Sequence, residues 1–244
     1  LYKVANRIKT PTIAQFSKKL IPYYDRHIGI ETLVNNFQSD YLFFHLDHCE
    51  DLDLIQHCVN SGFHSVMCDG SKFELDENIK LSNDAYKIAN KGGSLLEVEL
   101  GIVGGVEDEV EMGNSNYYDK DELIYFNENT NFDLLALSIG NVHGLQRNTD
   151  LVNPDLLIDA NELIGKQFYT LHGGTGLSDE ILFKAIRNGI VKINISTELK
   201  LKTIRILKEV ASVQKYYDEI NYFNEVVNHL SDFFLLKITK YTQV

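Results

Sequence analysis

Short apolar or β-branched runs alternate with longer amphipathic stretches along the chain. The short runs predict β-strands at 11–16, 41–46, 65–69, 95–100, 134–139, 168–171 and 190–194. The longer stretches predict helices, for example at 51–61, 76–91, 154–165, 179–188 and 197–210. A regular alternation of strand and helix is typical of βα units around a parallel sheet.

This alternation predicts an α/β fold, a TIM (β/α)8 barrel formed by one domain over residues 1–244. The length of 244 residues suits such a barrel, which typically has about 250. Seven strands are visible where a barrel has eight, so we expect the first strand to precede Leu1. An open doubly wound sheet is the alternative, but no GxGxxG motif follows an early strand.

Composition and charge narrow the function classes. A net charge of −12 disfavours a nucleic-acid-binding surface, which would carry a basic stripe. No apolar run reaches the roughly 18 residues that predict a membrane-spanning helix. The three cysteines (Cys49, Cys58, Cys68) form no CxxC pair, so we expect a reducing, cytoplasmic environment. An acidic protein can still bind phosphate through a metal ion and backbone N–H groups.

Polar side chains follow almost every predicted strand. The strand ends carry Ser17, Asp47-His48, Asp69-Gly70-Ser71, Glu97 with Glu99, Asn141 with His143, His172 and Asn194-Ile195-Ser196-Thr197. Catalytic groups of a barrel lie at the carboxyl ends of its strands, so we expect these side chains to meet at one rim.

Three of these strand ends carry a histidine. His48, His143 and His172 form the ligand set of a catalytic zinc site, which uses three protein ligands and keeps one position open. His45 shares a strand face with Asp47 and is predicted to be a packed or supporting residue. The remaining histidines lie on predicted helices or loops and are expected to be structural or solvent-facing: His27, His57, His64 and His229.

Two glycine-rich turns follow the candidate ligands, at Gly144 and at 173–176. Glycine lets backbone N–H groups approach an anion closely, and a helix N-terminus adds favourable partial charge. Thr175 and Thr197 could add hydroxyl donors. The polar stretch 106–131 is either a mobile active-site loop or a solvated connection.

Six motifs, in order along nearly the whole chain, resemble those of class II fructose-bisphosphate aldolases and their tagatose-bisphosphate relatives. The motifs are HLDH (45–48), VMCDGS (66–71), LEVELGIVGGVED (96–108), GNVHG (140–144), LHGGTG (171–176) and KINISTEL (192–199). The resemblance implies reversible cleavage of a ketose 1,6-bisphosphate to dihydroxyacetone phosphate and glyceraldehyde 3-phosphate, with fructose 1,6-bisphosphate favoured. It also implies a homodimer or homotetramer.

The resemblance assigns roles to individual residues. His48, His143 and His172 would bind Zn²⁺, with Asp69 and Glu99 near an alternate or second metal position. Asp47 would be the acid/base at the substrate C4 hydroxyl, and Glu107 would exchange the C3 proton of dihydroxyacetone phosphate. The residues expected at the substrate and its phosphates, with a monovalent cation (Na⁺ or K⁺), are Ser17, Gly144, Gly173, Thr175, Asn194, Ser196 and Thr197.

Several positions depart from the family pattern. The family's first strand, with a substrate-binding Asn, is absent from the chain. Thr175 stands where Ser is usual, and Arg147 lies near a position that is often Lys in fructose-specific members. Ser196 replaces an Asp of many fructose-bisphosphate enzymes, whereas tagatose-type relatives carry a small residue there. The choice of sugar therefore stays open.

Three rival hypotheses remain. Lys192 could be the amine nucleophile of a Schiff-base aldolase, which would leave the three histidines unexplained. A barrel metallohydrolase is the second, although such enzymes commonly begin with HxH rather than HLDH. The third is a metal-binding paralogue without catalytic activity.

Overall fold

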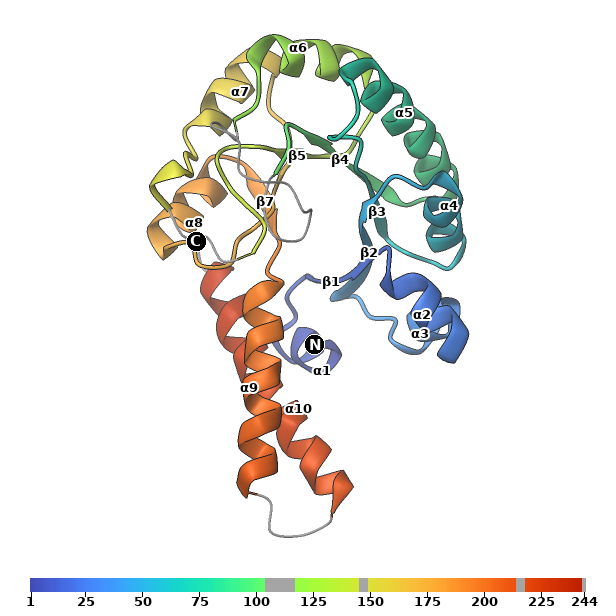
Figure 1. Ribbon diagram of the computed structural model, residues 1–244, viewed down its shortest axis with the longest axis vertical. Coiled ribbons are helices and arrows are strands. Elements are labelled where there is room, and N and C mark those ends of the chain that lie inside the picture. Colours follow the sequence, from blue (N-terminus) through green and yellow to red (C-terminus); the bar gives the residue numbers. More distant parts are fainter. Residues whose placement is uncertain (104–116, 145–148, 214–217, 243–244) are drawn as a thin grey trace.

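A computed structural model describes residues 1–103, 117–144, 149–213 and 218–242. Its centre is a seven-stranded sheet in which each strand pairs in parallel with the next strand along the chain (Figure 1). The strands are β1 (Thr12–Ser17), β2 (Leu42–Cys49), β3 (Ser65–Cys68), β4 (Leu95–Leu100), β5 (Leu134–Leu137), β6 (Tyr169–Leu171) and β7 (Ile190–Ile193). All seven predicted strands are thereby confirmed.

The sheet curls, and helices cover its outer side (Figure 1). The helices are α1 (Tyr2–Ile8), α2 (Leu20–His27), α3 (Ile30–Asn36), α4 (Leu52–Asn60), α5 (Leu75–Gly92), α6 (Lys120–Asn129), α7 (Leu156–Ile164), α8 (Asp179–Arg187), α9 (Thr197–Val213) and α10 (Glu219–Tyr241), with a 3₁₀ turn at Thr149–Leu151. This α/β architecture is TIM-barrel-like. An eighth strand is not present in the described ranges, and its position before Leu1 stays a prediction.

Local sequence signals set the ends of these helices. The carboxylate of Asp51 accepts hydrogen bonds from the backbone N–H groups of Asp53 (2.9 Å) and Leu54 (3.2 Å), which caps the start of α4. Ser178 caps α8 through Ile181 N. Gly93 ends α5 in the left-handed conformation, at φ 76°.

The two faces of the sheet differ in chemistry. Leu96, Val98 and Leu100 of β4 belong to the main apolar core between the sheet and the helices. The alternate residues of β4, Glu97 and Glu99, point to the other side, into the curl of the sheet, and are also buried. The interior of the curled sheet is therefore polar at the level of β4.

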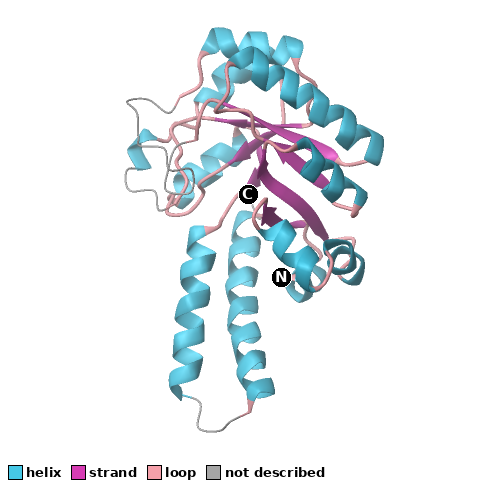
Figure 2. Ribbon diagram, turned by 45° about the vertical axis from the view of Figure 1, so that its right-hand side comes forward, coloured by secondary structure: helices cyan, strands magenta, loops and turns pink. Residues whose placement is uncertain are grey.

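Helices α9 and α10 project from the sheet as a hairpin (Figures 1 and 2). Ile206 and Val210 of α9 pack against Val226 of α10 in a small separate apolar cluster. Other apolar side chains of the hairpin are exposed, among them Leu201, Ile204, Ile220, Phe223 and Leu236. The expected homodimer or homotetramer stays a prediction. No helix in the described part of the chain combines the length and apolar character needed to cross a bilayer.

Two neighbouring leucines of β4 test which face of the sheet packs against the helices. Leu96 is 0% exposed and Leu95 is 51% exposed. We expect Leu96→Ala to lower the free energy of unfolding by about 2–5 kcal/mol, because it removes core contacts and leaves a cavity. The matched Leu95→Ala should change it by less than about 0.5 kcal/mol. Urea denaturation measures both, and equal losses would contradict the assignment of faces.

Candidate active site and metal centre

An irregularity at the end of β2 sets the first part of the site. The pairing of β2 with β3 shifts register between Leu46 and Cys49, and His48 has a φ of 47°, in the left-handed region. Regular alternation would direct Asp47 and His48 to opposite faces. In the structure both side chains contact interior groups. Asp47 accepts a hydrogen bond from Asn194, in the segment after β7, and His48 is hydrogen-bonded to His172.

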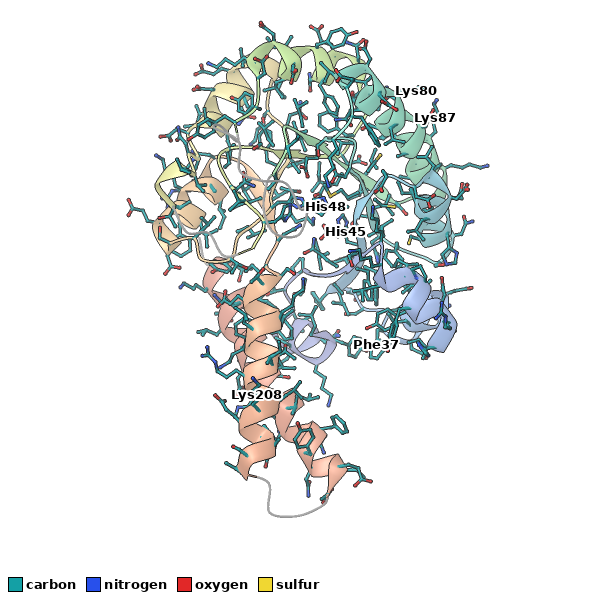
Figure 3. The ribbon with its side chains drawn as sticks, viewed as in Figure 1. Phe37, His45, His48, Lys80, Lys87 and Lys208 are labelled. Carbon is teal, nitrogen blue, oxygen red and sulfur yellow. The ribbon has the colours of Figure 1, made fainter. Side chains whose placement is uncertain are left out.

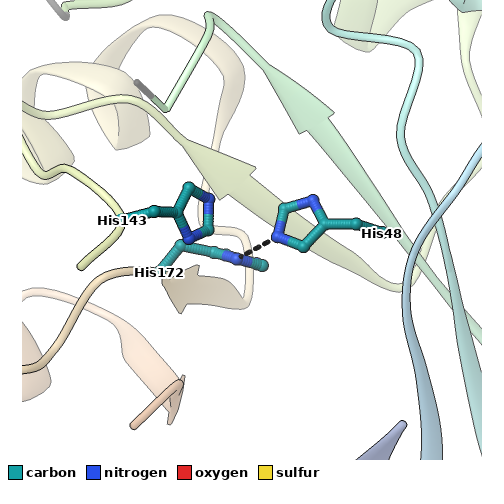
Figure 4. A group of neighbouring side chains, drawn as sticks. All are labelled: His48, His143 and His172. Atoms are coloured by element: carbon teal, nitrogen blue, oxygen red, sulfur yellow. Dashed lines mark hydrogen bonds between the residues drawn. The ribbon is translucent and has the colours of Figure 1, made fainter. Parts of the chain in front are cut away.

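Three imidazoles from distant parts of the chain meet at this rim (Figure 4). The ring of His48 lies 4.8 Å from that of His143 and 4.6 Å from that of His172, and the last two rings are 5.5 Å apart, all between centroids. One ring nitrogen of each lies within 4.8 Å of the others. Neutral imidazole is a common ligand of Zn²⁺, so these three residues fit a bound zinc ion.

The loops that carry His143 and His172 are held against each other. Gly173 has a φ of 66°, and a Cβ at this position would lie 2.0 Å from the carbonyl oxygen of Val142. Asn141 Nδ2 donates a hydrogen bond to His172 O at 2.9 Å. Only glycine allows this close approach, which brings the loops after β5 and β6, and hence their two histidines, together.

Hydrogen bonds define the protons on two of the imidazoles. His172 Nε2 lies 2.8 Å from Glu97 Oε1 and donates to it, so His172 Nδ1 is an acceptor. His48 Nε2 donates to that nitrogen at 2.9 Å, and His48 Nδ1 donates to Asp69 Oδ2 at 2.8 Å. His48 is therefore an imidazolium. Burial lowers the pKa of His48, but the hydrogen bond to Asp69 and the nearby Glu99 and Asp47 carboxylates raise it to about 10.

Asp69 and Glu99 lie on the Nδ1 side of His48, away from His172. Together with His48 they form a second group whose ligand atoms lie within 4.8 Å of one another. Asp69 Oδ1 accepts hydrogen bonds from the hydroxyl (2.7 Å) and the backbone N–H (3.1 Å) of Ser71. In this arrangement Asp69 orients His48, and the second group could hold a cation at a neighbouring position.

Asp47 is a half-buried carboxylate at the centre of the rim. Its Oδ1 accepts hydrogen bonds from Gln15 Nε2 at 3.2 Å and Asn194 Nδ2 at 3.3 Å. Burial raises the pKa of Asp47, but the neighbouring positive charges, that of His48 above all and then that of Lys192, have the larger opposite effect, so the net pKa lies below its ordinary value. Asp47 is therefore ionised near neutral pH and can accept a proton.

The structure brings most of the expected substrate residues to the same rim. Ser17 is the register partner of Asp47 on the neighbouring strand, and Asn194 Nδ2 lies 3.2 Å from His172 Nδ1. Thr175 Oγ1 accepts a hydrogen bond from Glu198 N at 3.4 Å, which joins the turn after β6 to the start of α9. Gly173, Ser196 and Thr197 lie on the same two segments, and Gly144 follows His143. Glu107 and Arg147 lie outside the described residues.

Sequence patterns did not predict that Glu97 and Lys192 pair behind the three histidines. The signal available in the sequence is Glu97 itself, a charged residue inside an apolar run. Lys192 is 6% exposed, and its Nζ donates to Glu97 Oε2 at 2.8 Å. An ammonium held in a buried ion pair is a poor nucleophile, which disfavours the Schiff-base alternative. His45 is fully buried inside the curl of strands (Figure 3), where burial and Lys192 lower its pKa to about 3, in keeping with a supporting role.

A curled parallel α/β sheet with three imidazoles and an ionised carboxylate at one rim is the arrangement of a metal-dependent barrel enzyme. The family profile of "Fructose-bisphosphate aldolase class-II" matches residues 1–242. A "Sulfofructosephosphate aldolase" of Alkalicoccus urumqiensis is 31% identical over 220 residues, which cover 86% of this chain and 74% of the relative. The chain therefore belongs to the class II fructose-bisphosphate aldolase family and is an aldolase, a carbon–carbon lyase.

Two solved structures have a similar fold. The YdjI aldolase of Escherichia coli K12 is 26% identical and superposes with a TM-score of 0.79, covering 98% of this chain and 85% of its own. A fructose-bisphosphate aldolase of Campylobacter jejuni, 20% identical, has the same fold at a TM-score of 0.80, with 99% and 85% covered.

The charged state of His48 makes a prediction for metal binding. A metal ion that binds at His48 Nε2 must replace a proton, so its apparent affinity should rise with pH below about 10, by up to about tenfold per pH unit for one released proton. Zn²⁺ titrations against a competing chelator from pH 6 to 9 measure this slope. Asp69→Asn removes the hydrogen-bonded carboxylate, lowers the pKa of His48 and should flatten the slope. A wild-type affinity that does not change with pH would contradict this protonation state.

Proposed function

We propose that this protein is a metal-dependent aldolase that reversibly cleaves a ketose 1,6-bisphosphate to dihydroxyacetone phosphate and glyceraldehyde 3-phosphate. Fructose 1,6-bisphosphate is the favoured substrate. The observation that carries the proposal is the convergence of His48, His143 and His172 beside the ionised Asp47.

His48, His143 and His172 would hold the metal, which we propose to be Zn²⁺. A bound Zn²⁺ supplies Lewis-acid chemistry that polarises the ketose carbonyl. Two contacts that orient His172 support this assignment. Asn141 donates a hydrogen bond to its backbone carbonyl, and Glu97 accepts one from its Nε2. Metal-ligating histidines usually donate their second ring nitrogen to such a partner.

Asp47 would accept the proton of the C4 hydroxyl during cleavage. As that proton leaves, the C3–C4 bond breaks, the C4 oxygen becomes the aldehyde oxygen, and the bonding electrons remain on the C3 fragment. In condensation Asp47 returns the proton to the aldehyde oxygen. Glu107, as in the family motif that it matches, would deliver a proton to C3. A well-placed acid/base typically contributes about 10²–10⁴-fold to the rate.

Buried polar groups support a site for the ketose and its phosphates. The Oδ1 atom of Asn194 is buried and lacks a hydrogen-bond partner among the described residues, so it can accept from a substrate hydroxyl. Gly144 and Gly173 would donate backbone N–H groups to a phosphate. A monovalent cation would bind beside the same phosphate. Hydroxyl donors to the same group would come from Ser17, Thr175, Ser196 and Thr197.

Two further sugars are candidate substrates. Identity of 31% to a sulfofructosephosphate aldolase favours a sulfofructose phosphate as the second candidate substrate. Ser196 is small where many fructose-bisphosphate enzymes carry Asp, which keeps tagatose bisphosphate as a third. A metal-binding paralogue without activity is the remaining alternative.

A comparison of substrates tests the reaction. Steady-state cleavage of fructose 1,6-bisphosphate, tagatose 1,6-bisphosphate and a sulfofructose phosphate is followed by coupled detection of dihydroxyacetone phosphate. We expect cleavage of at least one, with the highest kcat/KM for fructose 1,6-bisphosphate, and loss of activity with EDTA that Zn²⁺ restores. Activity that survives EDTA and is trapped by borohydride would reinstate Lys192 as a nucleophile. Metal binding without any cleavage would favour the inactive paralogue.

Two substitutions separate metal binding from proton transfer. We expect His143→Ala to lose metal, because it removes one of three imidazoles. Asp47→Ala should keep its metal and lose about 10²–10⁴-fold in kcat, because it removes only the acid/base. Metal analysis of purified protein and the cleavage assay give the two values. Wild-type turnover in either variant would refute the role assigned to that residue.

A further inference from the structure

Three buried ionisable side chains of the interior take no direct part in the proposed chemistry. His45 of β2 and Glu97 of β4 are 0% exposed, and Lys192 of β7 is 6% exposed. Charges at such depth are costly unless each is paired. The hydrogen-bond partners of these three side chains therefore indicate what the three residues do together.

Both oxygens of the Glu97 carboxylate are engaged. Oε1 accepts from His172 Nε2 at 2.8 Å, and Oε2 accepts from Lys192 Nζ at 2.8 Å. The first bond leaves His172 Nδ1 without a proton and turned toward His48. The second holds the carboxylate in the orientation that makes the first bond possible.

Lys192 is itself held in place. Its Nζ lies 3.3 Å from His45 Nε2, and an ammonium can only donate, so His45 Nε2 accepts. His45 then carries its proton on Nδ1, which lies 2.7 Å from Ser65 Oγ. A continuous hydrogen-bonded chain thus runs from Ser65 through His45, Lys192 and Glu97 to His172.

This chain crosses the interior, because Lys192 lies on a strand that pairs with neither of the strands that carry its two partners, His45 and Glu97. Ser65 belongs to β3, His45 to β2, Lys192 to β7, Glu97 to β4, and His172 follows β6. In the described residues β7 pairs with β6, so Lys192 reaches β2 and β4 only across the interior.

We propose that Lys192 is a positioning residue, whose ammonium anchors Glu97 so that Glu97 presents His172 Nδ1 to the metal. The inference rests on the metal site of the proposed function. Lys192 contacts neither the metal ligand atoms nor, in this role, the substrate. Partners of this kind typically change metal affinity by about 10–100-fold when they are substituted.

The test measures metal binding to the metal-stripped full chain rather than turnover. Zn²⁺ affinity is obtained by chelator competition, and Co²⁺ binding by its visible absorption spectrum, for wild type, Glu97→Gln, Lys192→Met and the double variant. We expect Glu97→Gln to weaken Zn²⁺ binding by about 10–100-fold and Lys192→Met by about 3–30-fold, with a changed Co²⁺ spectrum in both. The double variant should bind no more weakly than Glu97→Gln alone, because Lys192 acts through Glu97.

Three further variants control the interpretation. Lys184→Met removes an exposed lysine that pairs with Asp155, and should bind metal like wild type. Leu96→Ala should lower stability without changing metal affinity, which separates loss of stability from loss of positioning. Lys192→Gln keeps a donor for Glu97 and provides a second test should Lys192→Met not fold. It should bind metal more weakly than wild type but more tightly than Lys192→Met.

The possible outcomes are distinct. Wild-type metal affinity and spectrum in Lys192→Met, or in Lys192→Gln if only that variant folds, would overturn the positioning role. The positioning role would also be overturned if the loss of Zn²⁺ affinity in the double variant equalled the product of the losses in the two single variants. Absence of Zn²⁺ and Co²⁺ binding in wild type would instead refute the metal site of the proposed function.

Discussion

A carboxylate without access to water determines much of this structure. Glu97 points into the curl of the sheet and is fully buried, so each of its oxygens requires a donor. His172 and Lys192 supply those donors from β6 and β7, on the far side of the interior. The orientation of His172, and with it the nitrogen that faces His48, follows from satisfying one buried charge.

The rim above this charge is built from backbone conformations that are individually unfavourable. His48 is a non-glycine residue in the left-handed region, at φ 47°. Such a conformation costs on the order of 1–3 kcal/mol and persists where surrounding contacts determine it. Here the bonds of His48 to Asp69 and His172 provide those contacts. Strain at this position brings Asp47 and His48 to the same side, next to the substrate site that we propose.

In the function that we propose, the residues for the carbonyl chemistry and the residues for the choice of sugar lie on different parts of the rim. The three imidazoles converge on one point, and Asn194 links Asp47 to one of them, His172. In the proposed function this arrangement serves the carbonyl and C4 of a ketose phosphate. Glu198, in the first turn of α9, donates a hydrogen bond to Thr175, and Ser196 directly precedes this helix. In the proposed function, a change there alters which sugar phosphate is held without disturbing the carbonyl chemistry.

The sequence by itself determined the seven strands, their parallel order and the strand ends on which candidate ligands lie, because the alternation of short apolar runs with longer amphipathic stretches is a local signal. It also singled out His48, His143 and His172, which required only the rule that strand ends share one rim. Only the tertiary structure decided that Glu97 and Lys192 pair, that Gly173 presses against Val142, and that the strand irregularity turns His48 inward. Glu97 and Lys192 lie on strands that are not neighbours, and the geometry of all three features depends on the curl of the whole sheet, which no local pattern encodes.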